Sequence, residues 1–148
     1  MLPKNQLEQS LGSLVGRTAK LMTNALLTKF RAAGHEMGMD HWLILVHLWH
    51  QDGRNQQDLG HILGRNKTTM TRAINWLEEE NMVVRVSDQQ DRRLKRIFLT
   101  HKGKNTRTDM EPFMQEVIKE ATDGVPPKDL ETCKQVLAHV FDNLRLYI

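Results

Sequence analysis

Residues 55–100 read NQQDLGHILGRNKTTMTRAINWLEEENMVVRVSDQQDRRLKRIFLT, and they carry the clearest structural pattern of the chain. Helical periodicity marks two segments in its first half, Gln56–Leu63 and Lys67 to about Glu80. Asn55 and Asn66 directly precede them, and asparagine is a favoured N-cap because its side chain accepts hydrogen bonds from free backbone N–H groups. The pattern predicts two short helices joined by a tight turn.

A β-hairpin is expected directly after the second helix. Residues 82–87 are rich in β-branched side chains, and residues 96–100 form a second short strand candidate. Residues 88–95 between them are polar and turn-prone, so they predict a long charged tip. Two helices joined by a turn and followed at once by a hairpin make a winged helix-turn-helix pattern, in which the second helix enters the major groove of DNA.

The N-terminal half of the second helix has the side chains that a DNA-reading surface needs. It contains no acidic residue, and it offers cations and hydroxyl groups that bond to phosphates or base edges. The candidate residues on this helix are Asn66, Lys67, Thr68, Thr69, Thr71 and Arg72. Met70, Ile74 and Leu77 share the opposite face and are expected in the core. An ordinary amphipathic helix has the same pattern, and only the hairpin that follows favours the DNA-reading interpretation.

The hairpin tip is basic, with four cations in five residues: Arg92, Arg93, Lys95 and Arg96. A thin hairpin can place an arginine in the narrow minor groove, where the negative potential is strongest. Asp91 is expected to pair with and orient Arg93. The candidate wing residues are therefore Asp91, Arg92, Arg93 and Lys95. The alternative is a solvated loop whose charges only aid solubility.

The charge distribution points in the same direction. The chain has 148 residues, a net charge of +3 and a pI near 9.2. Residues 54–107 hold twelve basic and six acidic side chains, a net +6, whereas residues 108–148 hold four and eight, a net −4. A concentrated basic segment is expected of a phosphate-binding face, and chance clustering on a solvated surface is the alternative.

Several classes of protein are not expected. No apolar run is long enough to span a bilayer, and the N-terminus lacks the apolar stretch of a signal peptide. A lone cysteine, Cys133, fits a reducing cytoplasm, and its place in an apolar stripe predicts a buried, inert thiol. His47 and His50 lie three residues apart, but no zinc-ligand spacing is present, so no metal is expected. No nucleophile–base pattern or phosphate loop indicates an enzyme.

Long helices are expected at both ends of the chain. Apolar residues at helical spacing predict one helix from about Asn5 to Ala33, roughly 43 Å long at 1.5 Å per residue. Asp40 is expected to cap the helix that follows. Residues 101–121 and 128–147 predict two further helices, with a kink possible at Pro112. Such long apolar faces indicate a partner beyond the local core.

The chain resembles the MarR family. Residues 57–64 and 68–78 are similar to its helix-turn-helix, and residues 91–100 followed by Gly103-Lys104 are similar to its wing signature. The resemblance covers nearly the whole chain, although Gly60 stands where the family usually has alanine. It implies a homodimer held by the first and the last two helices, and a pseudo-palindromic operator read by two recognition helices roughly 34–36 Å apart.

The resemblance also implies a small, often aromatic effector that binds between the dimer helices and the DNA-binding lobe, where Trp42 could line the pocket. The expected fold is mainly α with a small β-hairpin wing. Residues 1–148 are expected to form one unit, with a winged lobe at 36–100 and dimerisation helices at 1–35 and 101–148. The expected function is a cytoplasmic, DNA-binding transcription regulator, a repressor released by an effector. The alternative is a winged-helix module that binds protein.

Overall fold

The computed structural model describes residues 4–147, which form seven α-helices, one 3-10 turn and a three-stranded sheet. The helices are α1 (Lys4–Glu8), α2 (Leu11–Ala32), α3 (Met39–His50), α4 (Gln56–Leu63), α5 (Lys67–Glu79), α6 (His101–Ala121) and α7 (Pro127–Leu144), followed by the 3-10 turn η1 (Arg145–Tyr147). The strands are β1 (Arg54–Asn55), β2 (Val83–Ser87) and β3 (Lys95–Leu99). The expected fold class, mainly α with a small wing, is confirmed.

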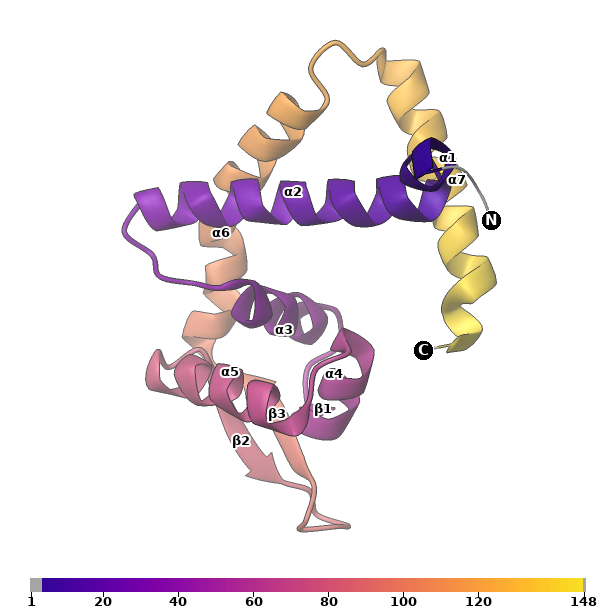
Figure 1. Ribbon diagram of the computed structural model, residues 1–148. Helices are drawn as coiled ribbons and strands as arrows, with labels where there is room; N and C mark the ends of the chain where they lie inside the picture. Colours follow the sequence, from indigo (N-terminus) through magenta and orange to yellow (C-terminus); the bar gives the residue numbers. More distant parts are fainter. Residues whose placement is uncertain (1–3, 148) are drawn as a thin grey trace.

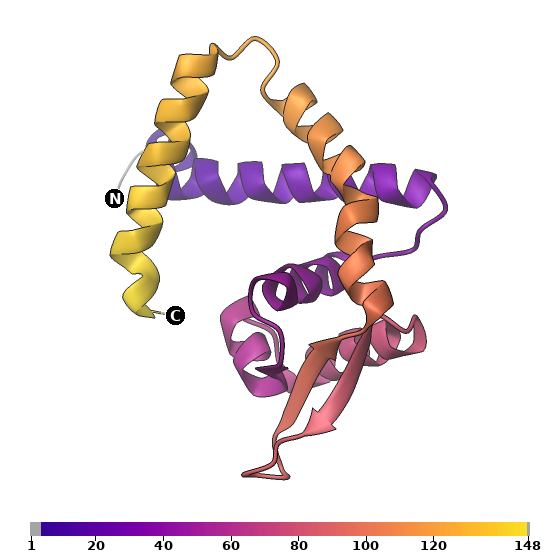
Figure 2. The ribbon, with the colours of Figure 1, turned by 180° about the vertical axis from the view of Figure 1, so that it is seen from behind.

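Figure 1 shows how these elements are arranged. The segment from α3 to β3 forms one lobe, here called the winged lobe, and the β2–β3 hairpin projects from it. The long helix α2 crosses above the lobe, and α6 leads from β3 up past α2. Helix α7 then descends at a distance from the lobe, which the reverse view also shows (Figure 2).

The sheet is antiparallel, with strand order β1-β3-β2. Val83 pairs with Leu99 and Ser87 with Lys95, so the hairpin register spans both strands completely. The short strand β1 pairs Arg54 with Ile97 on the other edge of β3. The sequence indicated only the hairpin, because a two-residue strand has no periodicity and exists only through its pairing with β3.

The core of the winged lobe consists of apolar side chains from every helix of the lobe. Ile44 and Leu45 on α3, Leu59 on α4, and Ile74 and Leu77 on α5 are all fully buried. Met70 is buried too, so the predicted core face of α5 is confirmed. Burying one such side chain stabilises the fold by about 1.5–3 kcal/mol, so this packing attaches the core face of α5 to the lobe.

Helix caps follow the sequence closely around the two short helices. Asn55 Oδ1 accepts from Gln57 N at 2.8 Å, and Asn66 Oδ1 accepts from Thr69 N at 2.8 Å. Asn81 adopts the left-handed conformation with φ 57° after α5. Thr100 caps α6, since its hydroxyl accepts from Gly103 N at 3.0 Å. Helix α6 runs without a break through Pro112.

One predicted helix is divided in two, and one predicted N-cap is wrong. The first helix is divided at Ser10, whose hydroxyl donates to Leu7 O at 2.8 Å and accepts from Ser13 N, so that α2 begins at Leu11. A serine side chain that bonds to nearby backbone groups competes with the helical pattern in this way. The N-cap of α3 is Gly38 rather than Asp40, because His41 Nδ1 accepts from Gly38 N at 3.0 Å.

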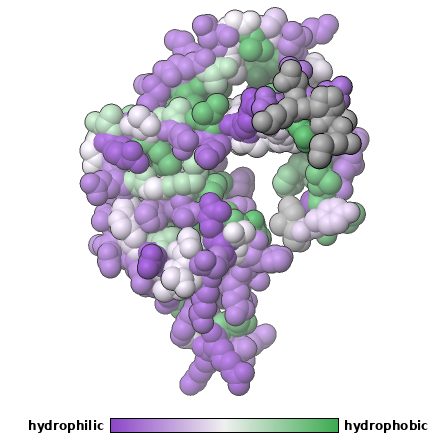
Figure 3. Space-filling view, viewed as in Figure 1, coloured by the Kyte–Doolittle hydropathy of each residue, from purple (hydrophilic) through white to green (hydrophobic). Residues whose placement is uncertain are grey.

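Helix α7 contains no buried residue in this chain; Leu130 and Val140 are half-buried and its other residues are exposed. Figure 3 shows an opening between α7 and the winged lobe, with apolar side chains beside it. Cys133 is exposed, so the expectation of a buried thiol is wrong for the single chain. Cys133 does lie on α7, but no other part of residues 4–147 buries the side chains of this helix.

Candidate nucleic-acid interface

The predicted residues of α5 divide into exposed and engaged side chains. Lys67, Thr68 and Arg72 are exposed, whereas Thr69 and Thr71 are half-buried. The Thr71 hydroxyl accepts from Gln56 Nε2 at 3.2 Å, so it is tied to the first residue of α4. The exposed cations stand at the N-terminal half of the helix, where the helix dipole also favours anions.

Asn66 is both the N-cap of α5 and a predicted DNA contact. Its side-chain oxygen caps α5, and the amide nitrogen of the same side chain remains a possible donor to phosphate.

The wing is ordered by two aspartates at its base and tip. Asp88 Oδ1 accepts from the backbone N–H groups of Gln90 and Asp91 at 2.8 and 3.1 Å, and its Oδ2 pairs with Arg96. The Arg96 hydrogen bond, followed by these backbone N–H groups, holds the pKa of Asp88 below its ordinary value. Arg96 also donates to Gly53 O at 3.1 Å, which anchors the wing to the lobe.

Asp91 does not act as predicted. Its Oδ1 accepts from the backbone N–H of Arg93 at 3.0 Å, and Leu94 N donates to Asp91 O at 3.0 Å. It therefore shapes the turn instead of pairing with the Arg93 guanidinium. Arg92 and Arg93 are exposed, and the ion pairs found among the described residues do not include them. Lys95 Nζ donates to Ser87 Oγ at 2.7 Å.

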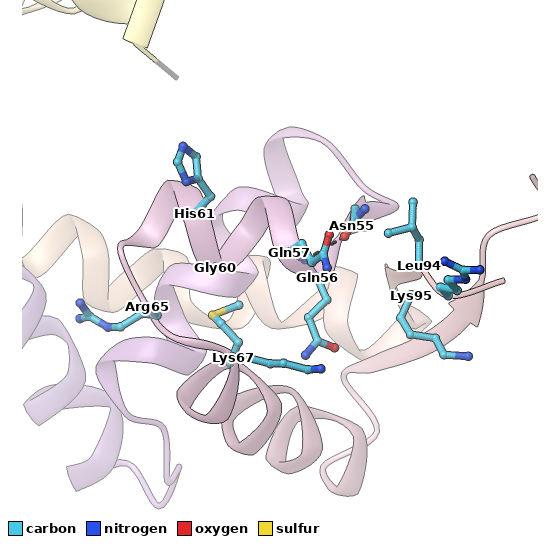
Figure 4. Close-up of a pocket in the computed structure, with 11 residues that line it drawn as sticks. Asn55, Gln56, Gln57, Gly60, His61, Arg65, Lys67, Leu94 and Lys95 are labelled. Atoms are coloured by element: carbon cyan, nitrogen blue, oxygen red, sulfur yellow. Dashed lines mark hydrogen bonds between the residues drawn. The ribbon is translucent and has the colours of Figure 1, made fainter. Parts of the chain in front are cut away.

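A groove of about 490 Å³ lies between the wing, α4 and α5 (Figure 4). Of the predicted residues, it brings together Lys67 from α5 with Arg93 and Lys95 from the wing. Arg72 and Arg92 are exposed but do not line it. The groove gathers cations from elements separated by more than twenty residues in the chain.

Sequence reasoning missed the contribution of α4 to this groove. Gln57 and His61 are exposed and line it, and Arg65 lines it while its Nε pairs with Asp40 at 2.7 Å. The four-residue spacing of Gln57 and His61 places both on one helix face, and this signal was available in the sequence.

No helix within residues 4–147 is long and apolar enough to cross a membrane. No group of three or more His, Cys, Asp or Glu side chains in residues 4–147 is arranged to hold a metal ion, and His47 and His50 belong to no such group.

Two short helices joined by a turn and followed by a hairpin define a winged helix-turn-helix protein. Residues 38–95 match the model of the MarR family. The fold is similar to that of a MarR transcriptional regulator from Methanosarcina mazei Go1, with 28% identity, a TM-score of 0.79, and coverage of 93% of this chain and 98% of that chain. Within residues 38–95 the chain therefore carries the MarR family's sequence pattern, and over most of its length it is similar to MarR transcriptional regulators.

More distant structures show the same fold. Wild-type MarR from E. coli in its apo form has 17% identity and a TM-score of 0.79, with coverage of 88% of this chain and 96% of that one. CouR from Rhodococcus jostii RHA1, bound to p-coumaroyl-CoA, has 21% identity and a TM-score of 0.69, with coverage of 90% and 93%. The similarity extends over the terminal helices as well as the winged lobe.

Proposed function

We propose that this chain is a cytoplasmic, sequence-specific transcription regulator that binds double-stranded DNA through the groove face of its winged lobe. The observation that carries the proposal is the meeting of exposed cations from α5 and the wing at one groove, with polar side chains of α4 beside them. Lys67 would contact phosphate, Thr68 and Arg72 would face the major groove, and Arg93 would reach the minor groove. Asp91 and Asn66 would act through the local backbone.

We propose further that the regulator works as a homodimer. Residues 1–35 and 101–148 would form the dimerisation region, and residues 36–100 the DNA-binding lobe. The exposed apolar side chains of the terminal helices support this assignment, since a second copy would cover them. They include Leu7, Leu11, Leu14, Val15, Leu21, Ile118, Val136, Leu137, Phe141, Leu144, Leu146 and Tyr147. The operator would then be pseudo-palindromic.

An effector-released repressor is the specific form that we propose. A cavity of about 160 Å³ lies between α2, α3 and α6, and Trp42 lines it with Leu26, Met114 and Val117. An apolar cavity with an aromatic wall suits a small aromatic molecule. The bound p-coumaroyl-CoA of CouR lends support by analogy. An effector would favour a spacing of the two lobes that does not match the operator.

The test is selection of bound duplexes from a random DNA pool, followed by a salt titration of binding to the selected duplex. We expect the logarithm of the association constant to fall linearly with the logarithm of salt concentration, because each phosphate contact releases counterions. A composition-matched shuffled duplex is the control, and we expect it to bind more weakly. Failure to enrich any duplex, or affinity that is indifferent to salt, would overturn the proposal and favour a protein-binding winged helix.

A further inference from the structure

Arg85 on β2 joins the wing to both helices of the helix-turn-helix. Its Nε donates to Gln56 Oε1 at 3.2 Å on α4, and one terminal nitrogen donates to Thr71 O at 3.3 Å on α5. The other terminal nitrogen pairs with Glu78, two helical turns further along α5. The Arg85 side chain is only 19% exposed. One guanidinium therefore contacts three residues on two helices.

Gln56 extends this contact to the predicted DNA-reading residues. While its oxygen accepts from Arg85, its nitrogen donates to the Thr71 hydroxyl at 3.2 Å. Figure 4 shows the Gln56 side chain pointing from α4 toward α5. Both the hydroxyl and the carbonyl oxygen of Thr71 are thus held by this network, one turn after the N-terminus of α5.

The position of Arg85 in the strand makes the arginine unusual. Its neighbours Val84 and Val86 are exposed, whereas Val83, on the same face of the strand as Arg85, is buried. An apolar side chain is the expected occupant of that inward-facing position. Even a fully buried ion pair can often be replaced by apolar side chains of similar size without loss of stability, so stability alone does not account for this half-buried arginine.

We propose that Arg85 is a positioning residue for DNA recognition. It fixes the rotation of α5 relative to the wing strand, so that the α5 side chains and the wing tip meet adjacent grooves together. The guanidinium suits this task because it is planar and carries donors on three nitrogens, whereas a lysine ammonium is a point charge that cannot span the same acceptors. The inference rests on the proposed function, and it identifies Arg85 as the residue that aligns α5 and the wing, the two elements proposed to contact DNA.

The variants Arg85→Met and Arg85→Lys test the inference, with Lys29→Met as the matched control. Lys29 forms an ion pair between α2 and α6, outside the winged lobe. Each variant is titrated with the duplex that the wild type selects and with a shuffled duplex of equal length and composition, at several salt concentrations. Thermal unfolding checks that each variant is folded.

We expect both Arg85 variants to lose about 10-fold or more in affinity for the selected duplex, with the shuffled-duplex affinity and the salt slope unchanged, because the phosphate contacts remain. Lys29→Met should bind the selected duplex and the shuffled duplex with the same affinities as the wild type. An equal loss of affinity for the two duplexes would indicate a merely structural role of Arg85 and would overturn the inference. Affinities equal to those of the wild type for both duplexes would overturn it too.

One outcome needs a second variant, and two others separate the inference from the proposed function. If Arg85→Met fails to fold, Glu78→Gln removes the charge from the same network with little change in size, and unchanged selectivity in that variant overturns the inference. A wild type that binds no duplex overturns the proposed function together with the inference. A wild type that binds selectively beside an equally selective, folded Arg85→Met overturns the inference alone.

Discussion

Hydrogen bonding at the scale of single residues separates the wing cations into two groups. Arg96 is held by Asp88 and the Gly53 carbonyl, and Lys95 donates to Ser87. Arg92 and Arg93 are exposed, and Arg93 also lines the groove. Arg93 is therefore the wing arginine that is exposed and also lines the groove. Its backbone N–H is held by Asp91.

Arg93→Ala should weaken binding to the selected duplex by about 1–3 kcal/mol, a typical contribution of a groove-reading arginine. Gel-shift or fluorescence anisotropy titration measures the change. Arg107→Ala is the matched control, because Arg107 is an exposed arginine on α6, which runs away from the wing tip (Figure 2). Equal affinities for Arg93→Ala and Arg107→Ala would remove Arg93 from the interface.

His41 is a second residue whose contacts have a measurable consequence. Its ring stacks on Trp76 of α5 with centroids 4.0 Å apart, and its Nδ1 accepts from Gly38 N. Burial lowers the pKa of His41 below its ordinary value of 6.5, and nearby Asp40 opposes this shift only in part. The neutral imidazole is therefore the form that the fold requires, since a protonated Nδ1 could not accept the hydrogen bond.

The free energy of unfolding should fall as the pH is lowered from about 7.5 to about 5.5. A His41 with a depressed pKa contributes stability that is fully present above 6.5, the ordinary value, and is lost as the pH falls through the depressed value. His41→Asn should reduce this dependence, measured by urea unfolding at several pH values. The pKa of His47 is lowered mainly by burial and less by the charges of Arg54 and His50, so His47 should still contribute to the pH dependence of stability in this variant. An unchanged pH profile for His41→Asn would refute the assignment.

At the scale of elements, the backbones of the hairpin and α6 approach each other closely at their junction. A Cβ atom added at Gly103 would lie 2.0 Å from the Met82 carbonyl oxygen. Gly103 O also accepts from Trp49 Nε1 at 3.0 Å, which joins α6 to α3. The glycine of the wing signature is therefore required by close backbone approach, and it sets where α6 leaves the sheet.

Gly103→Ala should lower the free energy of unfolding by about 1–3 kcal/mol or more, because the carbonyl cannot move without disturbing the hairpin. Thermal or urea unfolding measures the change. Asn105→Ala is the control, since Asn105 is exposed two residues later on the same helix. If Gly103→Ala is as stable as Asn105→Ala, the close approach does not constrain the fold.

At the scale of the whole molecule, the terminal helices differ from the winged lobe. The lobe has a closed core, whereas α7 has no buried residue and stands apart from the lobe (Figures 1 and 3). An isolated helix is marginal in water, and most helical stability in proteins comes from packing of an apolar face. The position of α7 is therefore best explained by contacts with a second copy, as proposed above.

Phe141→Glu should weaken the dimer, because a buried aromatic anchor at an interface commonly contributes about 2 kcal/mol or more. Phe141 is 61% exposed in the single chain. Light scattering or sedimentation at micromolar concentration should show the wild type as a dimer and the variant shifted to monomer. Val84→Glu, at a 45% exposed valine on the wing, should remain dimeric. A monomeric wild type would contradict the assignment of the terminal helices.

The local features of the winged lobe could be predicted from the amino-acid sequence. Asn55 and Asn66 were predicted as caps, because each acts on a backbone N–H group within three residues of itself. The core face of α5 followed from helical periodicity. These features depend on short-range geometry, which one chain segment specifies without its neighbours.

The tertiary structure alone decided what depends on residues far apart in the chain. Strand β1 exists only beside β3, and Gln57 and His61 become groove residues only where α4 lies beside the wing. The contact of Arg85 with Gln56 spans 29 residues and has no local signal. Packing of the core sets these distances, and a side chain's partners are fixed only after the elements that carry them have docked.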